Sequence, residues 1–109
     1  CFAMNPEAML RESIRVLKSN GRLVACIVPL ESPWGALYSE LGSRGHPYYS
    51  RARFLSVKWI TETLTRLGVK VTGYVATLSR GVGEYYEAPS NVDHANAGKY
   101  GFVCINAVK

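Results

Sequence analysis

The 109-residue sequence lacks several features that would by themselves indicate a function. None of its apolar runs approaches the roughly 18–20 residues that span a bilayer, and no basic segment leads into an apolar one near its start, as in a signal peptide. No Cys-x-x-Cys or His-x-x-x-His spacing occurs, so we expect no metal site. Internal repeats and low-complexity tracts are absent too. We therefore expect a soluble, cytoplasmic protein without a membrane segment.

Cysteine is scarce, and the three that occur are far apart: Cys1, Cys26 and Cys104. Two of them lie inside apolar, strand-like runs. This pattern is more typical of buried thiols in a reducing compartment than of a disulfide framework. We therefore expect free thiols.

Clusters of positive charge are also missing. Thirteen Lys and Arg against eight Asp and Glu give a net charge of +5, but the basic residues are scattered along the chain. A nucleic-acid-binding protein usually gathers them on one face and interleaves aromatic residues. A solvated basic surface is favoured over a nucleic-acid partner, which would reveal itself by a steep salt dependence of binding.

What is present is an ordinary globular composition, 48% hydrophobic and 19% charged, over a length that fits one domain. The first segment predicts a helix over 6–18, with Asn5 as its N-cap and Pro6 at its first position. Its apolar stripe has helical spacing and consists of Leu10, Ile14 and Leu17.

The stretch RLVACIV, residues 22–28, is apolar without alternation. Such a run predicts a strand of a largely parallel sheet that helices cover on both faces. A second helix is predicted over 56–67, with Ser56 as its cap, and further strands over 69–79 and 100–108. Whether the helices 6–18 and 56–67 lie on the same or opposite faces is open.

Two connections separate these elements. Residues 29–55 are too long for a plain turn and too aromatic for a linker, and 34–41 within them can form a short helix. Residues 80–99 are polar and glycine-rich, which indicates a loose hairpin connection.

Three stretches then resemble a known family: NPEAMLRESIRVLKSNGRLVACIVPLESPWGALYSEL, HPYYSRARFLSVKWITETLTRLGVKVTGYVATL and GKYGFVCINAVK. They are similar to the C-terminal half of class I S-adenosylmethionine-dependent methyltransferases of the small-molecule, ubiquinone and menaquinone biosynthesis-like type. In that family a helix ending in RVLKPGG leads into the fifth strand, here RVLKSNGRLVACIV. The SPWG and ARF motifs narrow the resemblance to a subgroup of these methyltransferases. The resemblance covers residues 5–109.

The resemblance implies an α/β fold: the C-terminal part of a Rossmann-like methyltransferase sheet, ordered helix-strand-helix-strand-strand. The last strand is antiparallel, and the first four strands are lacking. The chain is then a single partial domain, 1–109. Residues 1–28 form a helix and strand five, 29–55 the aromatic substrate-side connection, and 56–109 a helix and strands six and seven.

The implied function is that of the substrate-side half of an enzyme that uses S-adenosylmethionine to methylate a small molecule. The glycine-rich loop that binds the cofactor cannot be found, because GVGEYY at 81–86 lacks the third glycine and a preceding buried strand. We expect this chain to bind no cofactor and to be inactive alone. No catalytic residue is identified.

The resemblance also suggests site residues. The aromatic connection covers the substrate in the resembling enzymes, so its candidates for substrate binding are Trp34, Tyr38, His46, Tyr48, Tyr49, Arg53 and Phe54. Trp34 and Phe54 either contact substrate or only pack the connection against the sheet. His46 is either a general base or, as its Gly and Pro neighbours favour, a surface turn residue. Phe2 and Asn5 follow the fourth strand and are the candidates for cofactor binding.

An alternative function is a non-catalytic α/β module that self-associates. In the family's sheet the fifth strand lies between the fourth and seventh, so strand 22–28 loses one neighbour here. An open apolar edge is a template for pairing with another chain. We therefore expect a homo-oligomer that pairs through this edge, with or without swapped elements.

Overall fold

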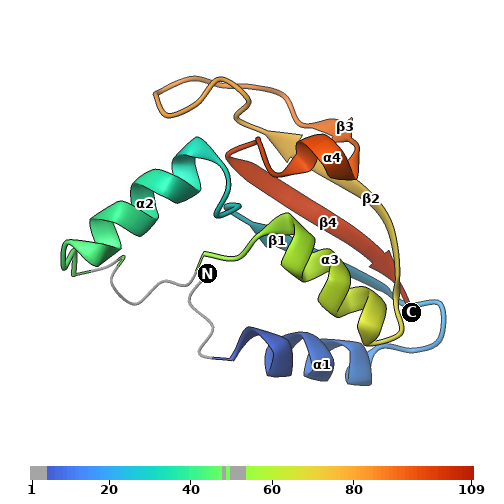
Figure 1. Ribbon diagram of the computed structural model, residues 1–109. Coiled ribbons are helices and arrows are strands. Elements are labelled where there is room, and N and C mark those ends of the chain that lie inside the picture. Colours follow the sequence, from blue (N-terminus) through green and yellow to red (C-terminus); the bar gives the residue numbers. More distant parts are fainter. Residues whose placement is uncertain (1–4, 48, 50–53) are drawn as a thin grey trace.

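The computed structural model describes residues 5–47, 49 and 54–109 of the chain (Figure 1). These described residues contain four helices and four strands. The helices are α1 (Pro6–Val16), α2 (Pro33–Ser43), α3 (Val57–Arg66) and the short α4 (His94–Ala97); the strands are β1 (Arg22–Ile27), β2 (Lys70–Thr77), β3 (Ser90–Val92) and β4 (Phe102–Val108).

The four strands form one sheet in the order β1-β4-β2-β3, and every neighbouring pair is antiparallel. The last strand therefore lies antiparallel between β1 and β2, as the family resemblance implies for strands five, seven and six. β1 and β2 run parallel to each other but are not neighbours, so the prediction of a largely parallel sheet is wrong for this chain. An additional short strand, β3, and the single-turn helix α4 both form within 80–99, where we expected a loose hairpin connection.

Side chains cap the N-termini of all four described helices. The Asn5 Oδ1 atom accepts a hydrogen bond from the Ala8 amide at 3.0 Å, and Ser56 Oγ accepts one from the Trp59 amide at 3.0 Å. Both predicted caps are thereby confirmed. The predicted short helix in the aromatic connection is also confirmed, and it begins at the capping residue Ser32.

A single hydrophobic core lies between the sheet and the helices. Leu10 and Ile14 of α1 and Leu64 of α3 are buried in it together with alternate residues of β4, which are Val103, Ile105 and Ala107. The helices α1 and α3 thus cover the same face of the sheet, as Figure 1 shows. This settles the arrangement that the sequence leaves open.

The opposite face of β1 is exposed. Arg22, Val24 and Cys26 alternate with the more buried Leu23, Ala25 and Ile27 along this strand. The prediction that protein covers both faces is therefore wrong for the described part of this chain. Val24 and Cys26 continue the apolar run, but no helix of the described residues lies over them.

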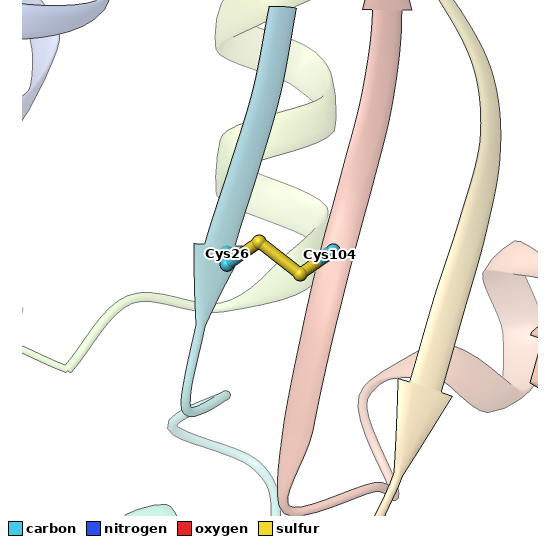
Figure 2. Close-up of a disulfide and its surroundings, with 2 residues drawn as sticks. All are labelled: Cys26 and Cys104. Carbon is cyan, nitrogen blue, oxygen red and sulfur yellow. A yellow bond between two sulfur atoms is a disulfide. The ribbon is translucent and has the colours of Figure 1, made fainter. Parts of the chain in front are cut away.

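A disulfide joins β1 to β4 on this exposed face (Figure 2). Cys26 and Cys104 lie opposite each other in the strand register, with their Cα atoms 3.9 Å apart and their sulfur atoms bonded at 2.02 Å. The prediction of free thiols is wrong for this pair. A separation of 78 residues hides the pairing from the sequence, and only the antiparallel register of β1 and β4 brings the two side chains together.

Candidate functional site

An aromatic hollow of about 490 Å³ lies where β1 and β2 end and β4 begins. The helix α2 projects beside it at this end of the sheet (Figure 1), and the loop 78–89 borders it. In open α/β sheets, ligands bind outside the carboxyl ends of the parallel strands, which is the position of this hollow. Its lining residues are Val28, Trp34, Tyr38, Thr77, Leu78, Tyr85, Tyr86, Glu87, Pro89, Gly101 and Phe102.

Trp34, in the first turn of α2, ties this helix to the loop 78–89. Its indole Nε1–H donates a hydrogen bond to the Gly81 carbonyl at 2.8 Å. The indole also packs directly on Gly101, where a β-carbon would overlap Trp34 Cδ1. Gly101 therefore has to be a glycine for the Trp34 ring to form this wall of the hollow.

Tyr38 follows one helical turn later and is the centre of an aromatic cluster. Its ring lies 4.6 Å from the Tyr49 ring and 6.2 Å from the Phe54 ring, stacked on both, and 6.0 Å from the tilted ring of Trp34. Burial raises the pKa of the Tyr38 hydroxyl, and the neighbouring Tyr49 raises it further. The hydroxyl is therefore neutral at physiological pH and can act as a hydrogen-bond donor.

Four of the predicted substrate residues, Trp34, Tyr38, Tyr49 and Phe54, are thus brought together. Of these, Trp34 and Tyr38 line the hollow. Tyr49 and Phe54 stack on Tyr38 and are not among the lining residues. The candidates Tyr48 and Arg53 lie outside the described residues.

His46 lies beside this cluster without lining the hollow. Its Nδ1 atom accepts a hydrogen bond from the Tyr49 amide at 3.2 Å, and the two rings are 4.7 Å apart. Of the two interpretations of His46, the geometry favours a turn residue that holds Tyr49 in position.

The two candidates for cofactor binding gain no support from the described contacts. Asn5 caps α1 with the side-chain oxygen that would otherwise be available to a ligand. Phe2 lies outside the described residues. The role of Asn5 in this structure is to begin a helix.

The loop 78–89 supplies site residues that the sequence prediction missed. The Tyr85 hydroxyl donates to the Gly81 carbonyl at 2.8 Å, and the Arg80 guanidinium lies 4.3 Å above the Tyr85 ring. Glu87 Oε1 accepts hydrogen bonds from Ser79 Oγ at 2.6 Å and from the Ser79 amide at 3.1 Å. These bonds lower the pKa of the Glu87 carboxyl. The signal in the sequence is the pair of adjacent tyrosines in a glycine-rich segment, which from the sequence alone we interpret as a loose hairpin connection.

A polar cluster lies where β2 meets the helices α3 and α4. The Tyr74 hydroxyl is 2.9 Å from Thr61 Oγ1 and 3.0 Å from His94 Nδ1, so these three groups form a short hydrogen-bonded chain. They join α3, β2 and α4. His94 thereby has a structural role that the sequence did not indicate.

The described residues do not fit the expected site for S-adenosylmethionine. Within residues 5–47, 49 and 54–109, no strand leads through a glycine-rich turn into a helix: β1 reaches α2 through 28–32 without a glycine, and GVGEYY lies between β2 and β3. The same residues contain no group of three side chains that could hold a metal ion. None of the described helices is long and apolar enough to cross a membrane.

Comparison with known sequences identifies longer relatives of unknown function, while no family model matches the chain. An uncharacterized protein of Mycobacterium tuberculosis is 36% identical over 109 residues, which are 99% of this chain and 38% of the relative. An uncharacterized protein of Methanocaldococcus jannaschii is 32% identical over 108 residues, which are 99% of this chain and 51% of the relative. The chain therefore spans about half the length of these relatives or less.

Comparison of structures adds a chemical description. The whole chain superimposes with a TM-score of 0.84 and 30% identity on 51% of a Thermotoga maritima protein described as a "SAM-dependent methyltransferase, possible histamine N-methyltransferase". The matched part is the C-terminal half of that protein. The resemblance to the C-terminal half of an S-adenosylmethionine-dependent methyltransferase is thereby confirmed. The narrower ubiquinone and menaquinone biosynthesis-like type stays a prediction.

Proposed function

We propose that this chain is the substrate-side half of an S-adenosylmethionine-dependent methyltransferase that acts on a small molecule. The observation that carries the proposal is the aromatic hollow at the carboxyl ends of β1 and β2, in a chain whose fold matches half of such an enzyme. A volume of about 490 Å³ suits a small acceptor. The matched protein's description as a possible histamine N-methyltransferase points to the same class of substrate.

The chemistry makes modest demands on the side chains. Methyl transfer from a sulfonium is an in-line displacement that depends on positioning and on the exclusion of water rather than on a covalent enzyme intermediate. Trp34 and Tyr38 can stack on an acceptor and exclude water from one side. The aromatic cluster behind Tyr38 keeps its ring in place.

By itself the chain should be inactive, because its described residues offer no cofactor site. Titration calorimetry of the chain with S-adenosylmethionine and with S-adenosylhomocysteine tests this. We expect no stoichiometric heat of binding. Tight binding of either compound by the isolated chain would contradict the claim.

A chimera tests the substrate-side role directly. This chain replaces the matched C-terminal half of the Thermotoga protein, and formation of S-adenosylhomocysteine is measured with histamine and other small amines and alcohols as acceptors. We expect the chimera to transfer methyl groups to one of these acceptors. Trp34→Leu should raise the KM for the acceptor and leave the affinity for the cofactor unchanged. A chimera that unfolds cooperatively and binds cofactor but methylates none of the acceptors would count against the proposal.

A second candidate function, self-association, is favoured by the edge of β1. Within the described part of the chain, β1 pairs only with β4, and its Val24 side chain is 55% exposed. An apolar groove of about 210 Å³ runs along this edge between Met9 and Leu10 of α1 and Leu55. We propose that a second copy of the chain pairs there when the chain is alone, because two β1 strands related by a two-fold axis are antiparallel. Centred on Val24, such a pair places Arg22 opposite Cys26 of the other copy, so no like charges meet.

A further inference from the structure

We propose that the aromatic hollow binds a small organic cation, such as a protonated or quaternary amine, between its aromatic rings and the Glu87 carboxylate. The inference rests on the proposed function and names its acceptor class as amines. It is drawn from the lining of the hollow: five aromatic side chains together with one acidic one, Glu87, and no basic one among the described lining residues.

The rings come from three separate elements. Trp34 and Tyr38 belong to α2, Tyr85 and Tyr86 to the loop 78–89, and Phe102 to the start of β4. Tyr86 is 85% exposed and Phe102 40% exposed, so both present ring surface to a ligand rather than to the core. Faces of aromatic rings attract cations through their quadrupole, and Trp and Tyr do so more strongly than Phe.

A cation is already held by one of these rings. The Arg80 guanidinium lies 4.3 Å above the centroid of Tyr85. Tyr85 itself is fixed by its hydroxyl, which donates to the Gly81 carbonyl that also accepts from Trp34. Arg80 does not line the hollow, but its position shows that the face of the Tyr85 ring accepts a cation.

Glu87 supplies the opposite charge in a fixed position. Ser79 holds Oε1 through its amide and its hydroxyl, at 3.1 and 2.6 Å, and the Glu87 carbonyl accepts from Thr77 Oγ1 at 2.6 Å. The carboxylate is thus ordered at the exposed surface before a ligand arrives. A fixed anion beside aromatic faces selects a cation over a neutral molecule of the same shape.

The same arrangement suits methyl transfer to nitrogen. In a complete enzyme, a protonated amine would first lose its proton to solvent, because only the neutral form has a lone pair. That lone pair would then attack the methyl carbon, with an N–C bond forming as the C–S bond breaks and the sulfonium becoming a neutral thioether. The positive charge of the cofactor thereby moves to the nitrogen, so that a neutral amine leaves as an ammonium ion. Aromatic faces and a carboxylate near the nitrogen stabilise this developing charge. An alcohol acceptor would require neither.

Choline and its neutral isostere 3,3-dimethylbutan-1-ol form the test pair. Each is titrated into the isotope-labelled chain, and the Trp34 indole N–H and the amides of 78–89 are followed by NMR. We expect saturable shifts with choline and at least five-fold weaker binding of the neutral alcohol. Equal affinities, or no binding of choline, would overturn the proposal.

Variants assign the preference to the named groups. Glu87→Gln should weaken choline binding about five-fold, whereas the matched control Glu84→Gln, in the same loop but outside the lining, should leave it unchanged. Phe102→Leu keeps an apolar side chain without a ring and should weaken choline binding about three-fold with little effect on the alcohol; it carries the test if Glu87→Gln does not fold. Unchanged choline affinity in a folded Glu87→Gln variant would refute the role of the carboxylate.

Methyl transfer by the chimera without cation preference refutes this inference alone, and a cation-selective hollow in an inactive chimera refutes the proposed function alone.

Discussion

Ser32 is the residue that fixes the start of α2 and hence the position of Trp34. Its side chain is fully buried at 0% exposure. The hydroxyl donates to the Pro29 carbonyl at 2.7 Å and accepts from the Gly35 amide at 3.0 Å. Gly35 itself packs on the Pro29 carbonyl so closely that a β-carbon would overlap that oxygen. The turn from β1 into α2 is therefore held by one hydroxyl and one missing side chain.

Replacing Ser32 should be costly for this reason. Ser32→Ala leaves the buried Gly35 amide without its capping acceptor, so we expect a loss of about 2 kcal/mol in the free energy of unfolding. Urea denaturation followed by circular dichroism measures it. The control Ser43→Ala removes an exposed hydroxyl at the other end of the same helix and should change stability by less than about 0.5 kcal/mol. Equal losses in the two variants would contradict the role of Ser32 as a buried cap.

Glu87 predicts a pH dependence. Hydrogen bonds from the Ser79 side chain and amide lower its pKa below the ordinary value of 4.5. A carboxyl whose pKa is lower in the folded state adds stability that is present above the unfolded value and is lost as the pH falls through the lower folded value. The stability difference between the unmodified chain and Ser79→Ala should therefore be constant at neutral pH and shrink below about pH 4.5.

Thermal unfolding over a series of pH values measures this difference. Ser43→Ala is the control, because its hydroxyl donates to the carbonyl of Glu40 rather than to a carboxylate. The difference for that variant should not change with pH. A Ser79→Ala difference that stays constant down to pH 3 would show that the hydroxyl does not support the charged form of Glu87.

At the scale of elements, the pairing of β1 with β4 joins the two ends of the chain. The strands match over six residue pairs from Arg22↔Val108 to Ile27↔Val103, and the disulfide links Cys26 to Cys104 within this register. A link across 78 residues restricts the unfolded chain, which by chain-entropy estimates is worth about 4.5 kcal/mol. The strand pair should persist without the bond, since Val103 and Ile105 are buried in the core.

Reduction of the disulfide should therefore destabilise the chain without changing its fold. We expect dithiothreitol to lower the urea midpoint, while the far-ultraviolet circular dichroism of the folded state stays the same. The double variant Cys26→Ala, Cys104→Ala should show the lower midpoint in both conditions and lose its response to dithiothreitol. An unmodified chain whose midpoint ignores the reductant would mean that the bond does not stabilise the fold.

The elements also show how far sequence reasoning reaches. Periodicity and capping residues predict α1, α3 and the three long strands, because the signals at Asn5, Ser56 and the apolar stripes are local. The strand β3 and the helix α4 were missed, since three and four residues carry too little pattern. For the candidate site, the aromatic connection was identified but its partner loop 78–89 was not. What brings Tyr85 and Glu87 to the hollow is the return of the chain from β2, which no short-range pattern encodes.

At the scale of the whole molecule, the described residues leave one face of the sheet and the edge of β1 open. Helices of the described residues cover the face that carries Ile27 and Val103, while Val24 and Cys26 face away from them. The relatives continue well beyond the matched region, since the chain spans 38% and 51% of their lengths. We propose that the open edge of β1 pairs with a second copy when the chain is studied alone.

Light scattering coupled to size exclusion tests this proposal, and we expect a dimer or larger oligomer at micromolar concentration. Val24→Lys should give a folded monomer, because Val24 is 55% exposed and a charge on an edge strand opposes pairing. Lysine at Ile27 would be a poorer test, since this residue is only 6% exposed and the change would disrupt the core. Asn91→Lys places the same charge on the opposite edge strand, β3, and should leave the oligomer intact. A monomeric unmodified chain, or a Val24→Lys variant of unchanged mass, would show that β1 does not pair with itself.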